Sequence, residues 1–132
     1  MARIFTQAEA TQLGLPGRKS MEILSGKKGT HSVTLRLVEI PVAAAGSPAR
    51  PPHSHSGFEE CIFVLSGSGV TIADSGEYQL KAGDTLWIPA GEKHYTRNIG
   101  DAPLQLLCFF PVGDVASATT ESIPASVPPA RL

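Results

Sequence analysis

Short segments in which apolar and polar residues alternate make up most of the chain, and this pattern predicts β-strands. Two of the segments, 33–40 and 104–110, are long and rich in β-branched or large apolar side chains. Glycine and proline turns separate the segments, which is typical of a closed barrel or a two-sheet jelly roll. The strands predicted in this way are 20–24, 33–40, 59–65, 70–73, 77–80, 85–88, 94–97 and 104–110.

The sequence also indicates two local structures outside this strand pattern. Thr6-Gln-Ala-Glu9 has the pattern of a capping box, which predicts a short helix that ends near Gly14. Ser66-Gly-Ser-Gly69 lies between two predicted strands, and a glycine turn in that position favours a β-hairpin. We therefore expect an all-β fold with one short N-terminal helix.

A single domain accounts for the whole length. The chain has 132 residues, of which 42% are apolar, and this is enough to bury one core. We divide it into an N-terminal helix and first strand at 1–30, which is a candidate dimer arm, a barrel at 31–113 and a C-terminal tail at 114–132. From Ala116 the tail is rich in Pro, Ala and Ser without periodicity, so its composition predicts disorder.

Charge and hydropathy argue against several classes of protein. The formal net charge is −1, so the basic excess of a nucleic-acid-binding protein is missing. The longest apolar runs, 42–45 and 106–110, are too short to span a membrane. The N-terminus lacks the apolar core of a signal peptide, and Cys61 and Cys108 lie in apolar segments that are typical of buried thiols. We expect a cytoplasmic protein without a disulfide.

Three of the four histidines fall into two clusters that carry candidate chemistry. His53 and His55 are two residues apart, so their side chains point to one face of an extended chain. Glu59 and Glu60 follow at the start of a predicted strand, and either carboxylate reaches the same point, while His94 begins a later strand. Imidazole and carboxylate donors suit Fe, Mn, Ni, Co or Zn better than calcium. Such histidine pairs also occur by chance, so the glycine and proline spacings around them matter.

These spacings resemble the two motifs of the cupin family. The first motif is matched by His53-Ser-His55, four residues, Glu60, six residues and Gly67. The second motif is matched by Gly83, five residues, Pro89-Ala-Gly91, two residues, His94, three residues and Asn98. One position departs from the family pattern, because the opening glycine of the first motif would fall on Ser47, next to Gly46.

The resemblance implies a cupin double-stranded β-helix, a jelly-roll barrel, of the kind found in small single-domain bacterial cupins related to quercetinases. Glu60, unlike Glu59, keeps the six-residue spacing to Gly67 and also becomes the candidate catalytic residue. The family commonly forms homodimers, and apolar outer residues such as Phe63 and Leu65 would need covering. Carried over by position, the resemblance implies one divalent metal per chain bound by His53, His55, Glu60 and His94.

Three functions are compatible with this reading. The first is a metal-dependent dioxygenase that acts on a metal-bound enol or hydroxyketone. The second is a redox-free isomerase, lyase or decarboxylase in which Glu60 moves protons. The third is a non-catalytic barrel that binds a small ligand. One fold hosts many chemistries, so the resemblance does not choose among them.

The substrate class depends on which side chains line the barrel. An apolar lining favours a planar, aromatic or small keto substrate over a sugar phosphate, whereas Arg36 or Arg97 turned inward would reverse that conclusion. Tyr78 and Tyr95 are further candidate contacts, and His31, which fits neither motif, is expected to be exposed. The candidate lining residues from strand parity are Ile62, Val64, Trp87 or Ile88, Thr96, Cys108 and Phe110.

Overall fold

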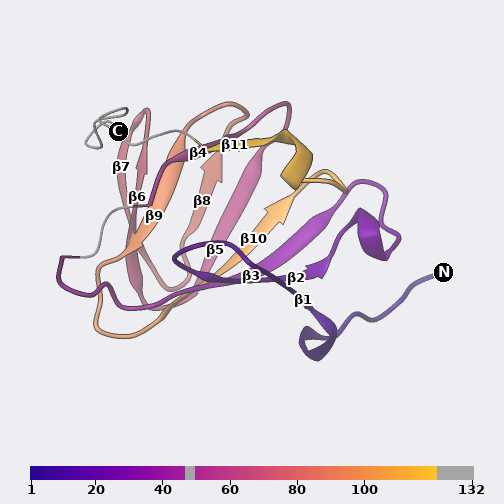
Figure 1. The fold of residues 1–132 in the computed structure, drawn as a ribbon, viewed down its shortest axis with the longest axis horizontal. Helices are drawn as coiled ribbons and strands as arrows, with labels where there is room; N and C mark the ends of the chain where they lie inside the picture. Colours follow the sequence, from indigo (N-terminus) through magenta and orange to yellow (C-terminus); the bar gives the residue numbers. More distant parts are fainter. Residues whose placement is uncertain (47–49, 122–132) are drawn as a thin grey trace.

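The computed structural model describes residues 1–46 and 50–121, which form two antiparallel sheets packed face to face (Figure 1). Ser47 and the last eleven residues of the predicted tail, 122–132, lie outside the described residues. One sheet has the strand order β1-β2-β3-β10-β5-β8, and the other has the order β11-β4-β9-β6-β7. Many neighbouring strands are distant in sequence, as the crossing connections of a jelly roll require.

All eight predicted strands correspond to strands of the structure, and the all-β jelly-roll prediction is confirmed. The six-stranded sheet contains β1 (Thr11–Leu13), β2 (Lys19–Leu24), β3 (Thr34–Ile40), β5 (Glu60–Ser66), β8 (Thr85–Ile88) and β10 (Leu104–Phe110). The five-stranded sheet contains β4 (His53–His55), β6 (Ser68–Ala73), β7 (Gly76–Lys81), β9 (His94–Asn98) and β11 (Thr119–Glu121). Three short 3-10 helices are described, namely η1 (Gln7–Glu9), η2 (Gly26–Lys28) and η3 (Ala116–Ala118).

The predicted N-terminal helix is only one turn of 3-10 helix. The Thr6 N–H group donates to Glu9 Oε2 at 3.3 Å, as a capping box requires, but η1 ends at Glu9. At Ala10 the backbone becomes extended, with φ −62° and ψ 143°, and the following residues form β1. The helix prediction is therefore wrong beyond Glu9, because pairing of β1 with β2 gives these residues a place at the sheet edge.

The predicted hairpin is also wrong, because the turn at Gly67 carries the chain from one sheet to the other. β5 pairs with β8 and β10, whereas β6 pairs with β7 and β9. Gly67 has a φ of 93°, and a Cβ atom there would lie 2.8 Å from the carbonyl oxygen of Pro103. Glycine is required at this crossing by both conformation and space.

The core lies between the two sheets, where the inward-facing residues of each strand meet. Val64 on β5 and Leu104 on β10 have no exposed surface. On the outer face of the six-stranded sheet, Phe63 and Trp87 are exposed at 40% and 57%. In β10 every second residue is buried, namely Leu104, Leu106, Cys108 and Phe110.

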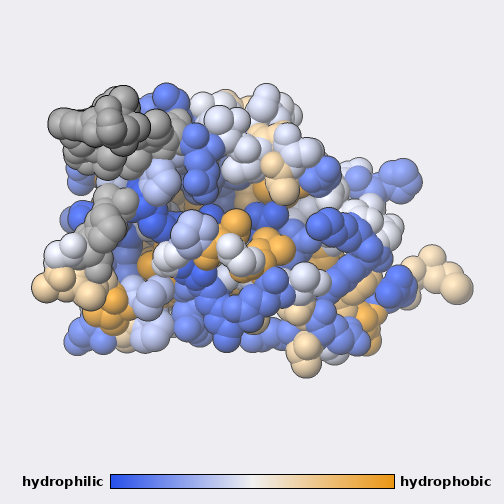
Figure 2. All heavy atoms as spheres, in the orientation of Figure 1, coloured by the Kyte–Doolittle hydropathy of each residue, from blue (hydrophilic) through white to orange (hydrophobic). Residues whose placement is uncertain are grey.

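The surface is polar over much of its area. On the face drawn in Figure 2, hydrophilic residues predominate and apolar residues form small separate areas. The N-terminal residues extend away from the sheets (Figure 1), and Ile4 among them is exposed at 89%. Among the described residues, no helix has the length and apolar character needed to cross a bilayer.

Candidate metal centre

The four predicted ligands come together between the sheets. His53 and His55 lie on β4, and His94, the first residue of β9, is paired with His53 in the strand ladder. Glu60, the first residue of β5, reaches the same point from the other sheet. His55, Glu60 and His94 are 5%, 4% and 2% exposed, so most of this four-residue cluster is buried.

The contacts within the four-residue cluster are short. Glu60 Oε1 lies 3.2 Å from His55 Nε2 and 3.1 Å from His94 Nε2. The ring centroids of His53 and His94 are 4.3 Å apart. One candidate ligand atom from each of the four residues lies within 4.8 Å of all the others, so the cluster could hold one metal ion.

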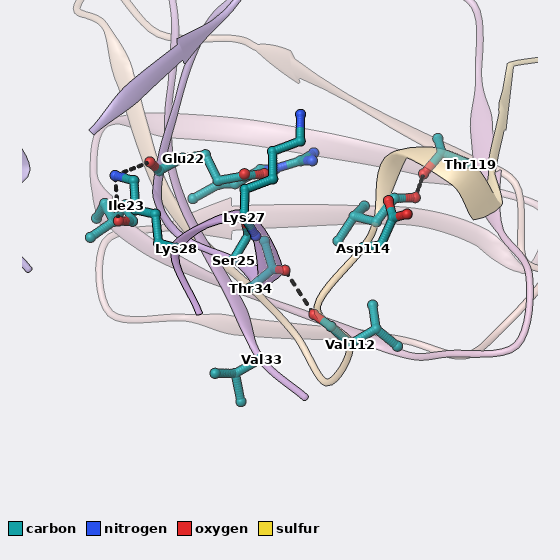
Figure 3. A network of polar contacts seen from close by, with 12 residues as sticks. Glu22, Ile23, Ser25, Lys27, Lys28, Val33, Thr34, Val112, Asp114 and Thr119 are labelled. Carbon is teal, nitrogen blue, oxygen red and sulfur yellow. Dashed lines mark hydrogen bonds and ion pairs between the residues drawn. The ribbon is translucent and has the colours of Figure 1, made fainter. Parts of the chain in front are cut away.

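Hydrogen bonds on the outer side of two rings show which nitrogen carries the hydrogen. His94 Nδ1 lies 2.9 Å from the Glu92 carbonyl oxygen, which can only accept, so His94 Nδ1 is the donor. His55 Nδ1 lies 2.9 Å from Thr119 Oγ1. That hydroxyl donates its own hydrogen to the Val115 carbonyl oxygen at 2.7 Å (Figure 3), so His55 Nδ1 must also be a donor.

The neutral rings therefore present lone pairs to a carboxylate. Nε2 of His55 and Nε2 of His94 both face Glu60 Oε1, and all three atoms are acceptors when the rings are neutral. Buried acceptors that face one another need a cation between them. Fixing Nδ1–H on a second group is also how proteins orient histidines for metal binding. The donor set therefore fits a divalent transition metal.

The ionisation of Glu60 and His53 is consistent with this fit. Burial acts to raise the pKa of Glu60, but the close contacts with the His55 and His94 rings outweigh burial and lower this pKa to about 2. Burial, followed by the charge of His94, lowers the pKa of His53 to about 3. Burial also acts to lower the pKa of His94, but the Glu60 carboxylate outweighs it and raises that pKa. Ionised carboxylate and neutral imidazole are the forms that bind metals, so Glu60 and His53 are ready to bind, whereas His94 has to give up its proton when a metal binds.

The four-residue cluster opens onto a cavity of about 870 Å³ that is open to the surface. Val64, a candidate lining residue, is buried in the core but does not line this cavity. Between the two alternatives on β8, Ile88 points inward with 3% exposure and Trp87 points outward. The candidate lining residues that do face the cavity are Ile62, Thr96, Cys108 and Phe110.

Arg36 also faces the cavity, which gives the wall a charged part. Its Nε donates to Glu22 Oε2 at 3.0 Å, and its guanidinium carbon lies 5.4 Å from the Phe110 ring centroid. The ion pair is largely buried, with side-chain exposures of 12% and 10%. An inward Arg36 is the condition that removes the preference for a planar, aromatic or small keto substrate over a sugar phosphate, and the cavity wall has both a charged and an apolar part.

The remaining candidates lie away from the centre or at its edge. Glu59 is exposed and accepts a hydrogen bond from Trp87 Nε1 at 2.8 Å, so it is not part of the four-residue cluster. His31 is exposed, as expected, and lies on the cavity wall. The candidates that do not line this cavity are Tyr78, Tyr95 and Arg97.

Sequence reasoning missed three residues that bear on the site. Thr119 lies in the predicted tail, yet β11 pairs with β4 and places Thr119 opposite His55. Arg18, between β1 and β2, and Arg50, before β4, both line the cavity. Neither arginine belongs to an alternating segment, and the only signal was that Arg50 stands three residues before His53.

Comparison with known families identifies the fold. The family described as Cupin domain matches residues 37–110, more than half of the chain, and the match contains all four residues of the cluster. The chain belongs to the cupin family. The match runs from within β3 to the end of β10, so it includes the strands that carry the four-residue cluster, while Arg18 and Thr119 lie outside it.

Relatives of this cupin differ in how much of the chain they share. It is 39% identical over 56 residues to an uncharacterized protein of Methanocaldococcus jannaschii, covering 42% of this chain and 45% of that protein. The chain thus spans less than half of that relative. It is 28% identical over 94 residues to an oxalate-binding protein of Thermotoga maritima, covering 71% of this chain and 76% of the relative.

Among solved structures, Pac13 of Streptomyces, a nucleoside dehydratase, superposes with a TM-score of 0.75. The superposition covers 98% of this chain and 99% of Pac13 at 14% identity. At that identity the likeness shows the shared fold and nothing about the reaction. The substrate of this cupin has to be argued from its own cavity.

Proposed function

We propose that this cupin binds one divalent transition metal at the four-residue cluster and acts there on a small organic molecule that bears a carboxylate. The reaction we propose is redox-free, of the isomerase, lyase or decarboxylase type. One observation carries the proposal: buried acceptors that need a cation open onto a cavity that is also lined by Arg18 and Arg50. The relative named an oxalate-binding protein supports a carboxylate ligand.

The chain's own residues would hold and serve such a centre. A divalent metal, when bound, acts as a Lewis acid that polarises a carbonyl group or stabilises an enolate. Thr119 and Glu92 fix the rings of His55 and His94, so their Nε2 atoms stay directed at the centre. Glu60 is the carboxylate of the cluster, and by loosening one of its contacts it can accept a proton from the substrate.

Product analysis of the metal-loaded protein tests this proposal. Hydroxy, keto and dicarboxylic acids are incubated with the protein in air and in a glove box, and NMR spectroscopy follows the products. We expect turnover that continues without dioxygen and is lost in Glu60→Gln. Metal content is measured on both proteins, so that loss of metal is not mistaken for loss of the proton acceptor. Binding of these acids without any turnover would contradict the enzymatic part of the proposal and indicate a ligand-binding barrel.

A dioxygenase is the second candidate, and the apolar part of the same cavity favours it. Ile62, Leu106 and Phe110 form a wall that suits a planar ring. An oxygen electrode with flavonols and catechols as substrates distinguishes the two reactions. Oxygen uptake that depends on the four-residue cluster would support the dioxygenase and contradict the redox-free proposal.

A further inference from the structure

Arg18 and Arg50 lie side by side on the cavity wall, although they are distant in sequence. Gly17, directly before Arg18, has a φ of 75°, and a Cβ atom there would lie 2.6 Å from Arg50 Cδ. The Arg50 side chain therefore passes directly over the backbone at position 17. The lack of a side chain at Gly17 allows the two arginines to lie next to each other.

Among the described residues, each guanidinium group uses only one of its hydrogen-bond donors. Arg18 Nη1 donates to the Pro16 carbonyl oxygen at 2.8 Å, and Arg50 Nη2 donates to the Thr96 carbonyl oxygen at 2.8 Å. A guanidinium has five N–H donors, so each group retains several for a ligand. Within residues 1–46 and 50–121, neither forms an ion pair, although the carboxylate of Glu121 lies on the same wall.

Arg36, the third cavity arginine, has a different role. It is held by Glu22 and by the Phe110 ring, so its charge is already compensated inside the wall. Arg18 and Arg50 instead lie close together as like charges in a partly buried place, with the charge of Glu121 acting on both. One carboxylate cannot balance two guanidinium groups, so an anionic ligand group would compensate the remaining positive charge. Burial, followed by the charge of Arg18, lowers the pKa of Arg50 to about 10, so this group stays positive at neutral pH.

The arginine pair, Arg18 and Arg50, shares the cavity with the metal ligands without being one of them. The Arg50 guanidinium is anchored on the backbone of Thr96, which lies two residues after His94 on β9. Arg18 lies outside residues 37–110, so it is contributed by a part of the chain that the family match does not cover. The cavity of about 870 Å³ has room for an acid longer than oxalate.

We propose that the arginine pair binds a second anionic group of the ligand, so that the substrate is a small dicarboxylate with one end at the metal and the other end on Arg18 and Arg50. This inference rests on the proposed metal-dependent function. Guanidinium groups bind carboxylates by paired, charge-assisted hydrogen bonds, which makes Arg18 a residue that determines specificity.

Calorimetric titration of the metal-loaded protein with pairs of acids tests this inference. Each pair has equal length and differs in one carboxylate: succinate against butyrate, and glutarate against pentanoate. A hydrogen bond to a charged group strengthens binding enough that we expect the dicarboxylate of the better-fitting pair to bind at least about tenfold more tightly than its monocarboxylate partner. Metal content is measured in every sample.

Three variants locate the effect. In Arg18→Gln we expect the dicarboxylate preference to disappear while the metal content and the circular dichroism spectrum stay at the wild-type level, which shows that the site is folded. Arg18→Lys keeps the charge and should retain part of the preference. Arg97→Gln is the matched control, because Arg97 is exposed and does not line the cavity, and it should bind like the wild type.

The outcomes separate this inference from the proposed function. Equal affinity for the two acids of each pair in the wild type, or an unchanged preference in Arg18→Gln, would overturn the inference and leave the metal-dependent function standing. A protein that takes up no metal, or binds neither kind of acid when loaded, would overturn the proposed function as well. Loss of the preference in Arg18→Gln alone supports the inference.

Discussion

Thr119→Val removes the hydroxyl group that holds His55 and leaves the shape of the side chain almost unchanged. The substitution takes away the acceptor of the His55 Nδ1–H group at 2.9 Å and the donor to the Val115 carbonyl oxygen at 2.7 Å. The His55 ring then loses the contact that directs its Nε2 atom at Glu60. We expect weaker metal binding with a small loss of stability.

The size of the effect follows from two independent considerations. A buried donor without a partner costs about 1–3 kcal/mol. Loss of the outer partner of a metal-binding histidine typically reduces metal affinity about 10–100-fold, which equals about 1.4–2.8 kcal/mol. Because the two ranges agree, we expect the dissociation constant for Zn²⁺ to rise about 10–100-fold.

Competition with a chromophoric chelator measures this change, and the absorption spectrum of the Co²⁺-loaded protein reports the ligand geometry. Thr119→Ser keeps the hydroxyl and should restore affinity and spectrum. Thr120→Val is the control, because Thr120 is exposed on the same strand. Wild-type affinity and an unchanged Co²⁺ spectrum in Thr119→Val would refute the claim that Thr119 positions His55.

Three further predictions concern stability and assembly. The pKa of His53 is about 3 in the folded protein against 6.5 ordinarily. Between these pH values the unfolded state binds more protons at His53, so the contribution of His53 lowers the stability of the metal-free protein as pH falls from 6.5 towards 3. Urea denaturation should show a flatter decline for His53→Gln, and an equally steep decline would contradict the assignment. Gly67→Ala places a Cβ atom 2.8 Å from the Pro103 carbonyl oxygen at a φ of 93°. We expect the free energy of unfolding to fall by more than about 1 kcal/mol. A wild-type urea midpoint would contradict the claim that the crossing at position 67 requires glycine. We propose that two copies pair through the outer face of the six-stranded sheet, where Phe63 and Phe109 are exposed. In Phe63→Glu we expect light scattering to give the mass of a monomer, with an unchanged circular dichroism spectrum. A variant that keeps the wild-type mass would count against this interface.

Sequence patterns predicted the longer strands well because each strand has one buried face. The segments 85–88 and 104–110 coincide with β8 and β10, since alternation marks the strand and a turn ends it. Residue parity placed His53 and His55 on one face but left Glu59 and Glu60 open. The resemblance to the cupin motifs completed the set of four residues that the structure brings together.

What the sequence did not reveal depends on contacts between distant segments. β1, β4 and β11 have three residues each, too few for an alternating pattern to be read. The crossing at Gly67 has the same local signature as a hairpin turn, and only the pairing partners of β5 and β6 distinguish the two. Arg18, Arg50 and Thr119 acquire their roles from where the sheets place them, which their local sequence does not encode.

Metal content of the protein, purified without a metal-binding tag and measured by inductively coupled plasma mass spectrometry, tests the central claim most directly. We predict about one divalent transition metal per chain, retained in His31→Ala, whose side chain lies outside the four-residue cluster, and lost in His94→Ala. Protein that carries no metal as purified and takes up none on titration, or a His94→Ala variant that keeps the wild-type content, would contradict the account.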